Sequence, residues 1–327
     1  MNYLIFLLFL KMSQSKEYTT EELKELETLS TQFHDALFGK SIDENTLVEI
    51  LSNTTNEERQ IIRGYYKKAY NHPIQNDINS QLTNKLREIT IDLFDTPYEY
   101  DARELHNALN SFTNDDNTIV EIFVSRPKSH LEIVDLAYKK FFKISLREDI
   151  QKQGAKEYSQ FLLALMDIER PLDQTISGKD AYNVAKELMK NGLKAYGTDV
   201  NLFKNVFVEK SREDLILISR AYYESNKKSL YDAIEADVPG KNRRLLKGLL
   251  FAVITPAQWF AKKCLKAIQG RGGNNNTLFR VLISRAEIDM YAIRDYYFME
   301  SNTEIKNAIA DDTNGAYGQI LVNLCLK

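Results

Sequence analysis

Apolar residues recur along the chain at intervals of three and four positions, which is the period of an amphipathic helix. In the last quarter of the chain the apolar positions are Leu278, Val281, Leu282, Ile288, Tyr291 and Ile293. The spacing breaks near Ser284–Ala286, which predicts that one helix ends there and another begins. Only 13 Gly and 6 Pro are spread through 327 residues, so few positions interrupt helices. The pattern predicts an all-α fold.

The helical pattern itself occurs four times. Four segments share the same apolar spacing, and each ends on a tyrosine: Glu49–Tyr66, Glu121–Tyr138, Asn205–Tyr222 and Arg280–Tyr297. In the last segment, either Tyr296 or Tyr297 is the equivalent tyrosine. Successive segments are offset by 72, 84 and 75 residues, and the same offsets align the leucines near the repeat ends, Leu93, Leu165, Leu249 and Leu324. We therefore predict four repeats of about five short helices each, with the Tyr, Leu and Ile stripes packed in the core.

The offsets also divide the chain. The predicted parts are an N-terminal segment 1–19, repeat 1 at 20–95, repeat 2 at 96–166, a connector 167–178, repeat 3 at 179–254 and repeat 4 at 255–327. The connector explains the longer middle offset and carries the Pro, Asp, Ser and Gly of a loop between two halves. Ser211 and Asp214 have the spacing of a capping box, with Asp in place of Glu.

Composition narrows the class of protein. A formal net charge of -3 indicates neither a general nucleic-acid footprint nor an acidic tail, and 43% hydrophobic with 27% charged residues is typical of a soluble globular chain. Two cysteines, Cys264 and Cys325, give no disulfide framework, so we interpret them as core thiols in a reducing, cytoplasmic compartment.

The N-terminal segment contains one apolar run, Tyr3–Leu10. The run is much shorter than the about 20 residues that span a bilayer. Met12 opens a polar stretch that resembles an ordinary soluble N-terminus. An extension upstream of the true start, a short anchor and the core of a signal peptide all fit, and secretion is the least favoured because no basic region precedes the run.

The later repeats carry specific sequence words. They are AIQGRGG at Ala267–Gly273, LFRVLISRAEID at Leu278–Asp289, DDTNGAYGQILVNLCL at Asp311–Leu326, LKAYGTD at Leu193–Asp199 and TPYEYDARELHNAL at Thr96–Leu109. These words resemble the repeats of the annexin family, and the resemblance extends from Thr20 to the C-terminus. It implies a divergent annexin of four five-helix repeats in a curved disc. The divergence of the repeats also fits a resemblance to the annexin-like giardins of flagellate protists.

The resemblance also implies calcium sites. Calcium takes six to eight oxygen ligands, and a Gly-rich loop can turn several carbonyls toward one point. The implied ligands are Gly192, Ala195 and Gly197 with the acid Asp237 in repeat 3, and Ile268, Gly270 and Gly272 with the acid Asp312 in repeat 4. Gln81 and Gln153 stand at the acid position of repeats 1 and 2, where an amide supplies no anionic ligand. We expect those two sites to be lost or very weak.

Two further groups of residues match the family pattern. Tyr196 and Arg271, in the same loops, are candidate membrane contacts, and solvated loop side chains are an equal alternative. The second group matches the charged cluster of the central passage of annexins and consists of Asp101, Glu104, Arg126 and Arg280. Ion conduction is one interpretation of this cluster, and we prefer a buried ion-pair network between the two halves.

Together these features predict a monomer that binds anionic phospholipid membranes peripherally through calcium, in the interhelical loops of repeats 3 and 4. The alternative is a helical scaffold for cytoskeletal or other proteins, in which calcium is secondary. The four histidines, His34, His72, His106 and His130, lack metal-ligand spacing, and no known catalytic motif is present. We therefore propose no catalytic residue, no nucleic-acid partner and no cofactor other than calcium.

Overall fold

The computed structural model describes the residues 16–111, 115–154, 156–190, 200–269 and 275–327. In these residues all regular secondary structure is helical, which confirms the all-α prediction. The chain divides into two compact units. Unit 1 comprises Met1–Tyr100 and Ala257–Lys327, and unit 2 comprises Asp101–Pro256. The chain thus pairs its first repeat with its last, and its second with its third.

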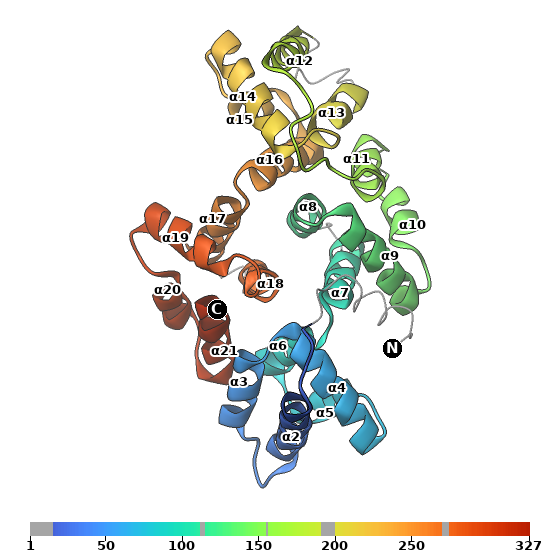
Figure 1. Ribbon diagram of the computed structural model, residues 1–327, viewed down its shortest axis with the longest axis vertical. Helices are drawn as coiled ribbons and strands as arrows, with labels where there is room; N and C mark the ends of the chain where they lie inside the picture. The colour runs from blue at the N-terminus through green and yellow to red at the C-terminus, as the bar shows by residue number, and fades with distance from the viewer. Residues whose placement is uncertain (1–15, 112–114, 155, 191–199, 270–274) are drawn as a thin grey trace. The chain divides into compact units, whose positions relative to one another are not determined.

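Unit 1 contains repeats 1 and 4, whose helices are drawn in blue and red in Figure 1. The helices of repeat 1 are α2 (Thr20–Phe38), α3 (Glu44–Asn53), α4 (Asn56–Tyr70), α5 (Ile74–Gln81) and α6 (Asn84–Phe94). Those of repeat 4 are α17 (Pro256–Gln269), α18 (Asn275–Arg285), α19 (Met290–Ser301), α20 (Ile305–Asp312) and α21 (Gly315–Leu326). Each repeat has the five helices that the sequence predicts.

Unit 2 contains repeats 2 and 3. The helices of repeat 2 are α7 (Pro97–Asn110), α8 (Asp116–Ser125), α9 (Lys128–Phe142), α10 (Leu146–Gln151) and α11 (Lys156–Asp167). Those of repeat 3 are α12 (Gly178–Lys190), α13 (Val200–Phe207), α14 (Arg212–Asn226), α15 (Leu230–Asp237) and α16 (Gly240–Ile254). These two repeats also have five helices each.

Local sequence signals fix several helix starts. The predicted capping box at Ser211 and Asp214 is confirmed at the start of α14. Further capping boxes begin α2 at Thr19, α4 at Thr55 and α10 at Ser145. In each of them a hydroxyl and an acidic side chain satisfy N–H groups that the first helical turn leaves unpaired.

The core of each repeat contains the tyrosine that closes its repeated segment. The four buried residues are Tyr66, Tyr138, Tyr222 and Tyr297, so Tyr297 rather than Tyr296 is the fourth equivalent. Cys264 and Cys325 are buried free thiols, as predicted. Ile288 and Tyr291 are 63% exposed each, so their assignment to the core stripe is wrong. They follow the break between α18 and α19, and intervals counted across a break do not keep residues on one face.

Repeats 1 and 4 meet through a buried arginine in unit 1. The Nε of Arg59 donates to the carbonyl of Leu93 at 2.8 Å, and its guanidinium also donates to the carbonyl of Thr54 and to Glu287 of repeat 4. The backbone N–H of Asn56 donates to the same Glu287 carboxylate at 2.9 Å. Burial lowers the pKa of Arg59, and Glu287 partly offsets this effect. The arginine thereby satisfies carbonyls at helix ends that would otherwise be orphaned.

Repeats 2 and 3 meet where α8 packs on α16 in unit 2. Gly248 permits the close approach, because a Cβ there would lie 2.8 Å from a methyl group of Val120. The predicted connector lies inside this unit rather than between the two units. Arg170 of the connector donates to the carbonyl of Phe207 at 2.5 Å, and Thr175 donates to the carboxylate of Asp214.

Asp214 thus serves both the connector and its own helix start. Burial by itself raises the pKa of Asp214, but hydrogen bonds from Thr175, Ile176 and Ser211 outweigh it and hold the pKa below its usual range. Since the carboxylate accepts bonds from the connector as well as from the cap, one side chain joins two parts of unit 2.

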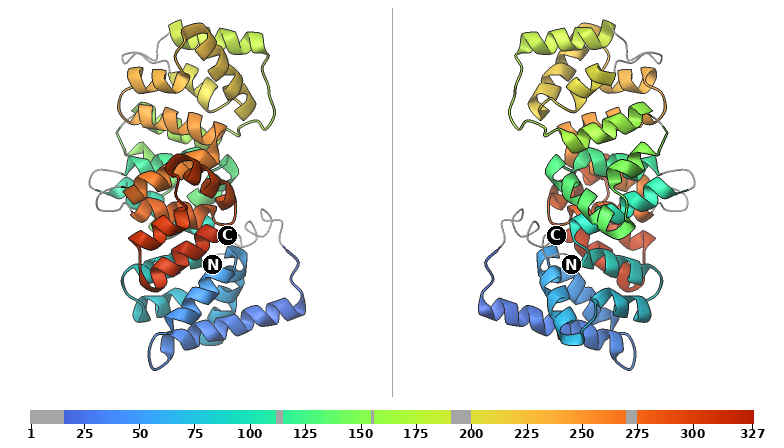
Figure 2. Two further views of the ribbon diagram at one scale, coloured as in Figure 1. Left: turned by 90° about the vertical axis from the view of Figure 1, so that its left-hand side faces the viewer. Right: turned by 90° about the vertical axis from the view of Figure 1, so that its right-hand side faces the viewer.

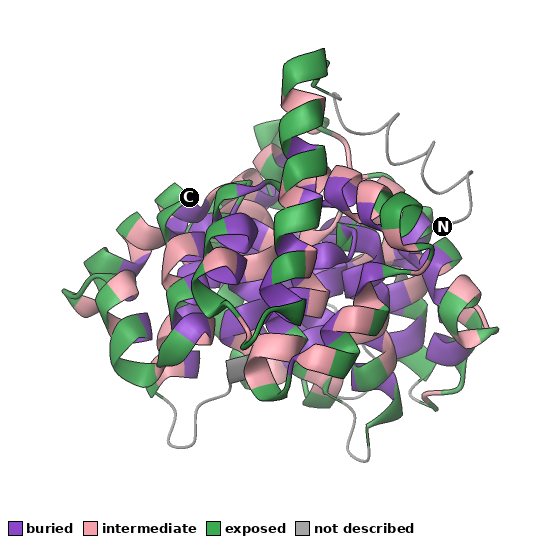
Figure 3. Ribbon diagram, turned by 90° about the horizontal axis from the view of Figure 1, so that it is seen from below, coloured by how far each residue is buried: buried purple, intermediate pink, exposed green. Residues whose placement is uncertain are grey.

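One helix differs from its counterparts in the other repeats. Helix α2 has 19 residues, whereas the first helices of repeats 2, 3 and 4 have 14, 13 and 14. Its first turns extend beyond the other helices of repeat 1 (Figure 2), and its N-terminal half is largely exposed (Figure 3). Among the described residues, no helix is long and apolar enough to cross a bilayer.

Candidate calcium sites

The two predicted calcium-binding acids occupy equivalent helix ends. Asp237 is the last residue of α15 and Asp312 is the last residue of α20. We call the turn after the fourth helix of a repeat its 4–5 turn. In both turns the next helix begins three residues later with a glycine, and the φ angles of Gly240 and Gly315 are 60° and 63°. A left-handed conformation of this kind disfavours a Cβ, so the glycines help to fix both turns.

Neither acid is neutralised within the described part of the chain. Asp237 is half-buried and Asp312 is exposed, and neither carboxylate has a hydrogen-bond or ion-pair partner there. Each also lies in the last helical turn, where the helix dipole places partial negative charge. Both effects favour a cation beside these carboxylates.

The loops that would face these acids fall largely outside the described residues. We call the loop between the first and second helices of a repeat its 1–2 loop. Ile268 is half-buried in the last turn of α17, immediately before the loop of repeat 4. The remaining predicted loop residues lie outside the described residues, and they are Gly192, Ala195, Tyr196, Gly197, Gly270, Arg271 and Gly272.

Repeat 2 has a different arrangement at the same place. The side-chain amide of Gln153, in its 4–5 turn, donates to the carbonyl of Leu109 at 3.4 Å and to that of Asp149 at 3.3 Å. The repeat offsets make Leu109 equivalent to Leu37, in the last turn of α2, and to Ile268 of repeat 4. An amide N–H therefore approaches the carbonyl that a cation would have bridged to an acid.

The 4–5 turn of repeat 1 has neither the acid of repeats 3 and 4 nor the long-range glutamine bond of repeat 2. The side-chain amide of Gln81 donates to the hydroxyl of its neighbour Ser80 at 3.2 Å. The 1–2 loop of repeat 1 is closed by the same backbone hydrogen bond as that of repeat 2. The N–H of Asp43 donates to the carbonyl of Ala36, and the N–H of Asp115 donates to the carbonyl of Ala108, both at 2.9 Å. A closed 1–2 loop thus forms in both repeats without an acid in the 4–5 turn.

A hollow of ≈430 Å³ lies next to Asp312 in unit 1. It lies between the 4–5 turns of repeats 1 and 4, and its lining includes Gln81, Lys85, Asp312 and Tyr317. The N-termini of α6 and α21 border it, and neither has a side-chain cap. The hydroxyl of Tyr317 is buried without a hydrogen-bond partner in the described structure, and burial raises its pKa. Glu44 also lines the hollow, and Lys85 is already paired with Glu88 at 2.8 Å, so the carboxylates of Glu44 and Asp312 leave the hollow negatively charged.

The predicted central polar cluster is partly assembled in unit 2. Arg126 binds Asp101 through Nε at 2.8 Å and through Nη2 at 3.1 Å, and His130 approaches the same carboxylate at 2.8 Å. Glu104 is half-buried one turn after Asp101 on α7. Burial by itself raises the pKa of Asp101, but Arg126 and His130 outweigh it and hold the pKa well below its usual range.

Arg280 belongs to α18 of unit 1, where it is buried and donates to Thr277 at 3.5 Å. The contact between His130 and Asp101 is one that sequence reasoning missed. The repeat alignment contains a signal for it, because His130 stands where Glu58 and Asp214 form capping boxes.

Within the described ranges, no group of three or more His, Cys, Asp or Glu side chains is placed to hold a metal ion. The predicted calcium sites differ from such a cluster, because each would use one carboxylate and several backbone carbonyls. Asp237 and Asp312 fit this role, because they lie in glycine-fixed turns and have no partner in the part of the chain that the structure describes.

The fold and these turns define a class: a helical protein of four five-helix repeats with a candidate calcium turn in each of its last two. The Annexin family model matches residues 30–93, 100–165, 183–249 and 259–324. The chain belongs to the annexin family, which is known for calcium-dependent phospholipid binding and is generally non-enzymatic.

Individual relatives agree with this assignment. Annexin A1 of Rattus norvegicus is 30% identical over 292 residues, which cover 89% of this chain and 84% of that protein. The structure of annexin III superposes with a TM-score of 0.87 at 25% identity and covers 95% of both chains. A calcium-bound annexin (Sm)1 superposes with a TM-score of 0.82 at 25% identity and covers 95% of this chain and 92% of that one.

Proposed function

We propose that this protein attaches peripherally to anionic phospholipid membranes through calcium held in the 1–2 loops and 4–5 turns of repeats 3 and 4. The observation that carries the proposal is a pair of carboxylates, Asp237 and Asp312, at equivalent helix C-termini, neither of which has a partner among the described residues. Bound calcium would supply positive charge that both the protein oxygens and a lipid phosphate can coordinate.

The residues that would hold each ion come from two places in a repeat. Asp237 would act with the carbonyls of Gly192, Ala195 and Gly197. Asp312 would act with those of Ile268, Gly270 and Gly272. The single carboxylate would contribute the negative charge, and the carbonyls would contribute neutral oxygens, as expected for a hard cation.

Charge explains why the attachment would need calcium. The chain has a formal net charge of -3, so its long-range field does not attract an anionic membrane. A divalent ion at each of two turns would replace this weak repulsion by local attraction. Tyr196 and Arg271 belong to the same proposal, as an interfacial aromatic ring and a phosphate-binding guanidinium.

Co-sedimentation with vesicles of phosphatidylserine and phosphatidylcholine tests the proposal, in calcium and in chelator. The double substitution Asp237→Ala with Asp312→Ala should abolish the calcium-dependent bound fraction. A matched control is Asp311→Asn with Glu224→Gln, because it removes two exposed carboxylates that are not at the acid positions. The control should bind like wild type.

The scaffold alternative makes the opposite prediction. If the protein chiefly binds cytoskeletal or other proteins, the two acids are dispensable and the double substitution leaves the vesicle-bound fraction unchanged. Equal binding of wild type and the double variant in calcium would therefore overturn the membrane proposal and favour the scaffold.

A further inference from the structure

A groove of ≈1330 Å³ separates α2 from α3 in repeat 1, entirely within unit 1. We call it the α2–α3 groove. Its lining runs from the chain before α2, at Lys16 and Tyr18, to the 1–2 loop and the first turn of α3. The groove lies along the exposed side of the helix that is longest in the described structure.

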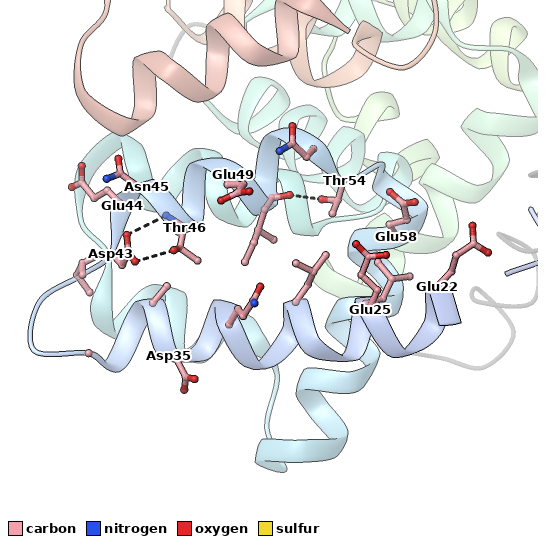
Figure 4. Close-up of a pocket in the computed structure, with 18 of the residues that line it drawn as sticks. Glu22, Glu25, Asp35, Asp43, Glu44, Asn45, Thr46, Glu49, Thr54 and Glu58 are labelled. Carbon is pink, nitrogen blue, oxygen red and sulfur yellow. Dashed lines mark hydrogen bonds between the residues drawn. The ribbon is translucent and has the colours of Figure 1, made fainter. Parts of the chain in front are cut away.

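Carboxylates dominate the edges of this groove. Seven acidic residues and two lysines line it. Figure 4 shows Glu22, Glu25 and Glu58 at one end, Asp43 and Glu44 at the other, and Glu49 between the helices, whereas Asp35 points away. The charge is thus distributed along the length of the groove.

Much of this charge is not compensated by the protein itself. Lys16 is already bound to Glu22 at 2.7 Å, and Asp43 accepts bonds from Thr46. The acids that have no hydrogen-bond or ion-pair partner among the described residues are Glu25, Glu44 and Glu49. They come from both helices, so a ligand in the groove would meet negative charge on both sides.

The floor of the groove is apolar. Leu26 and Ile50 belong to the core beneath it, and Leu29 and Ile42 are half-buried at its surface. A metal ion or a small polyamine would gain nothing from this floor. A ligand with one apolar face and basic flanks would use both the floor and the edges.

In repeat 2 the residues at the equivalent positions are buried. The repeat offset makes Glu49 equivalent to Glu121 and Leu29 equivalent to Asp101. Glu121 is 0% and Asp101 is 1% exposed, whereas Glu49 is exposed and Leu29 is half-buried. Repeat 1 therefore leaves open a pair of helix faces that repeat 2 buries.

We propose that the α2–α3 groove binds a basic amphipathic helix of a partner protein. A helix laid along α2, which is about 28 Å long, would place lysines or arginines opposite both acidic ends. Its apolar face would cover Leu29 and Ile42 in the helix-in-groove mode. An anionic membrane would be repelled by the same carboxylates, so the groove favours a basic protein segment over a lipid surface.

A designed peptide tests the proposal without knowledge of the natural partner. The probe is a fluorescein-labelled peptide of lysine and leucine, about 14 residues long, with its leucines on one helical face. Its affinity is measured by fluorescence anisotropy in chelator and without lipid, so a failure of the calcium proposal does not affect the result. A scrambled peptide of the same composition controls for net charge.

Two pairs of substitutions distinguish binding in the groove from attraction by net charge alone. Glu25→Gln with Glu49→Gln should weaken binding roughly fivefold, as expected for the loss of two exposed ion pairs. Glu27→Gln with Glu224→Gln changes the net charge equally at exposed acids outside the groove and should leave the affinity unchanged. Thermal unfolding followed by circular dichroism confirms that both variants are folded.

Three outcomes would overturn the proposal. The first is equal weakening by both pairs, because binding would then follow net charge alone. The second is equal affinity for the scrambled peptide, because the apolar floor would then be unused. The third is that the peptide does not bind, while calorimetry shows calcium binding that is lost only in the variant Glu25→Gln with Glu49→Gln. The groove would then be a cation site instead.

Discussion

The 4–5 turns of repeats 4 and 2 use one helical framework in two ways. In repeat 4 the turn follows a carboxylate, Asp312, that has no partner among the described residues. In repeat 2 it contains an amide, Gln153, that reaches the carbonyl of Leu109. An amide N–H can contact that carbonyl directly, whereas a carboxylate and a carbonyl repel each other unless a cation lies between them. Under the proposed function, the side chain at this position would decide whether the carbonyl is met by an amide N–H or by a bound cation.

The 4–5 turn of repeat 1 has the backbone conformation of repeats 3 and 4 without their acidic side chain. Asn84, three residues after Gln81, has a φ of 53°, close to the values of Gly240 and Gly315. Repeat 1 thus keeps the left-handed residue of the calcium-type turn and lacks the acid. Under the proposed function, the turn geometry alone would not make a calcium site.

The largest expected effect is that of Asp312→Asn, which gives repeat 4 an amide at its acid position. Removing a unit charge about 4 Å from a cation forfeits on the order of 1–4 kcal/mol, so calcium affinity at repeat 4 should fall roughly tenfold or more. Isothermal titration calorimetry should show the number of calcium ions per chain fall from two to one. Asp311→Asn, one residue earlier, should keep both, and loss of a site in this control would contradict the assignment.

A smaller effect is expected from the left-handed residues. Gly315→Ala places a Cβ at a φ of 63° and should lower the free energy of unfolding by about 1 kcal/mol. Asn84→Gly should change it by only a few tenths of a kcal/mol, roughly, because asparagine tolerates this conformation. Urea denaturation in chelator measures both. An unaffected Gly315→Ala would mean that glycine is not required for the turn.

The smallest effect concerns the amides. Gln153→Ala removes a bond to a carbonyl 44 residues away and should cost about 0.5–1 kcal/mol, at the low end because the bond is long. Gln81→Ala removes only a contact with a neighbour and should be near neutral. Thermal unfolding should give the same difference with and without calcium. A difference that appears only in calcium would show that repeat 2 retains a metal site.

Several features of the fold were predictable because they depend on local spacing. The three- and four-residue apolar period gave the helices, and the offsets of 72, 84 and 75 residues gave the four repeats. The buried tyrosines followed from the same alignment, and the capping box at Ser211 followed from its three-residue spacing to Asp214. Ile288 and Tyr291 were misassigned because the helical period does not continue through a break between helices.

The candidate sites were also predictable only in part. Asp237 and Asp312 became candidates through the family resemblance, and the structure places both at equivalent helix ends. The partner of Gln153, the contact of His130 with Asp101 and the α2–α3 groove were not visible in the sequence. Each joins elements far apart along the chain, or depends on a face that a neighbouring repeat leaves open.

The sequence by itself determined the class of fold and the number of repeats, because periodicity and repeat register are properties of the chain. The family resemblance supplied the two acids as candidates. The tertiary structure decided that repeat 1 shares a unit with repeat 4, that Arg59 and Glu287 join them, and that repeat 1 keeps an open acidic groove. Contacts of this kind depend on how helix faces pack in space, and a repeated sequence pattern assigns equivalent faces without saying which of them will be covered.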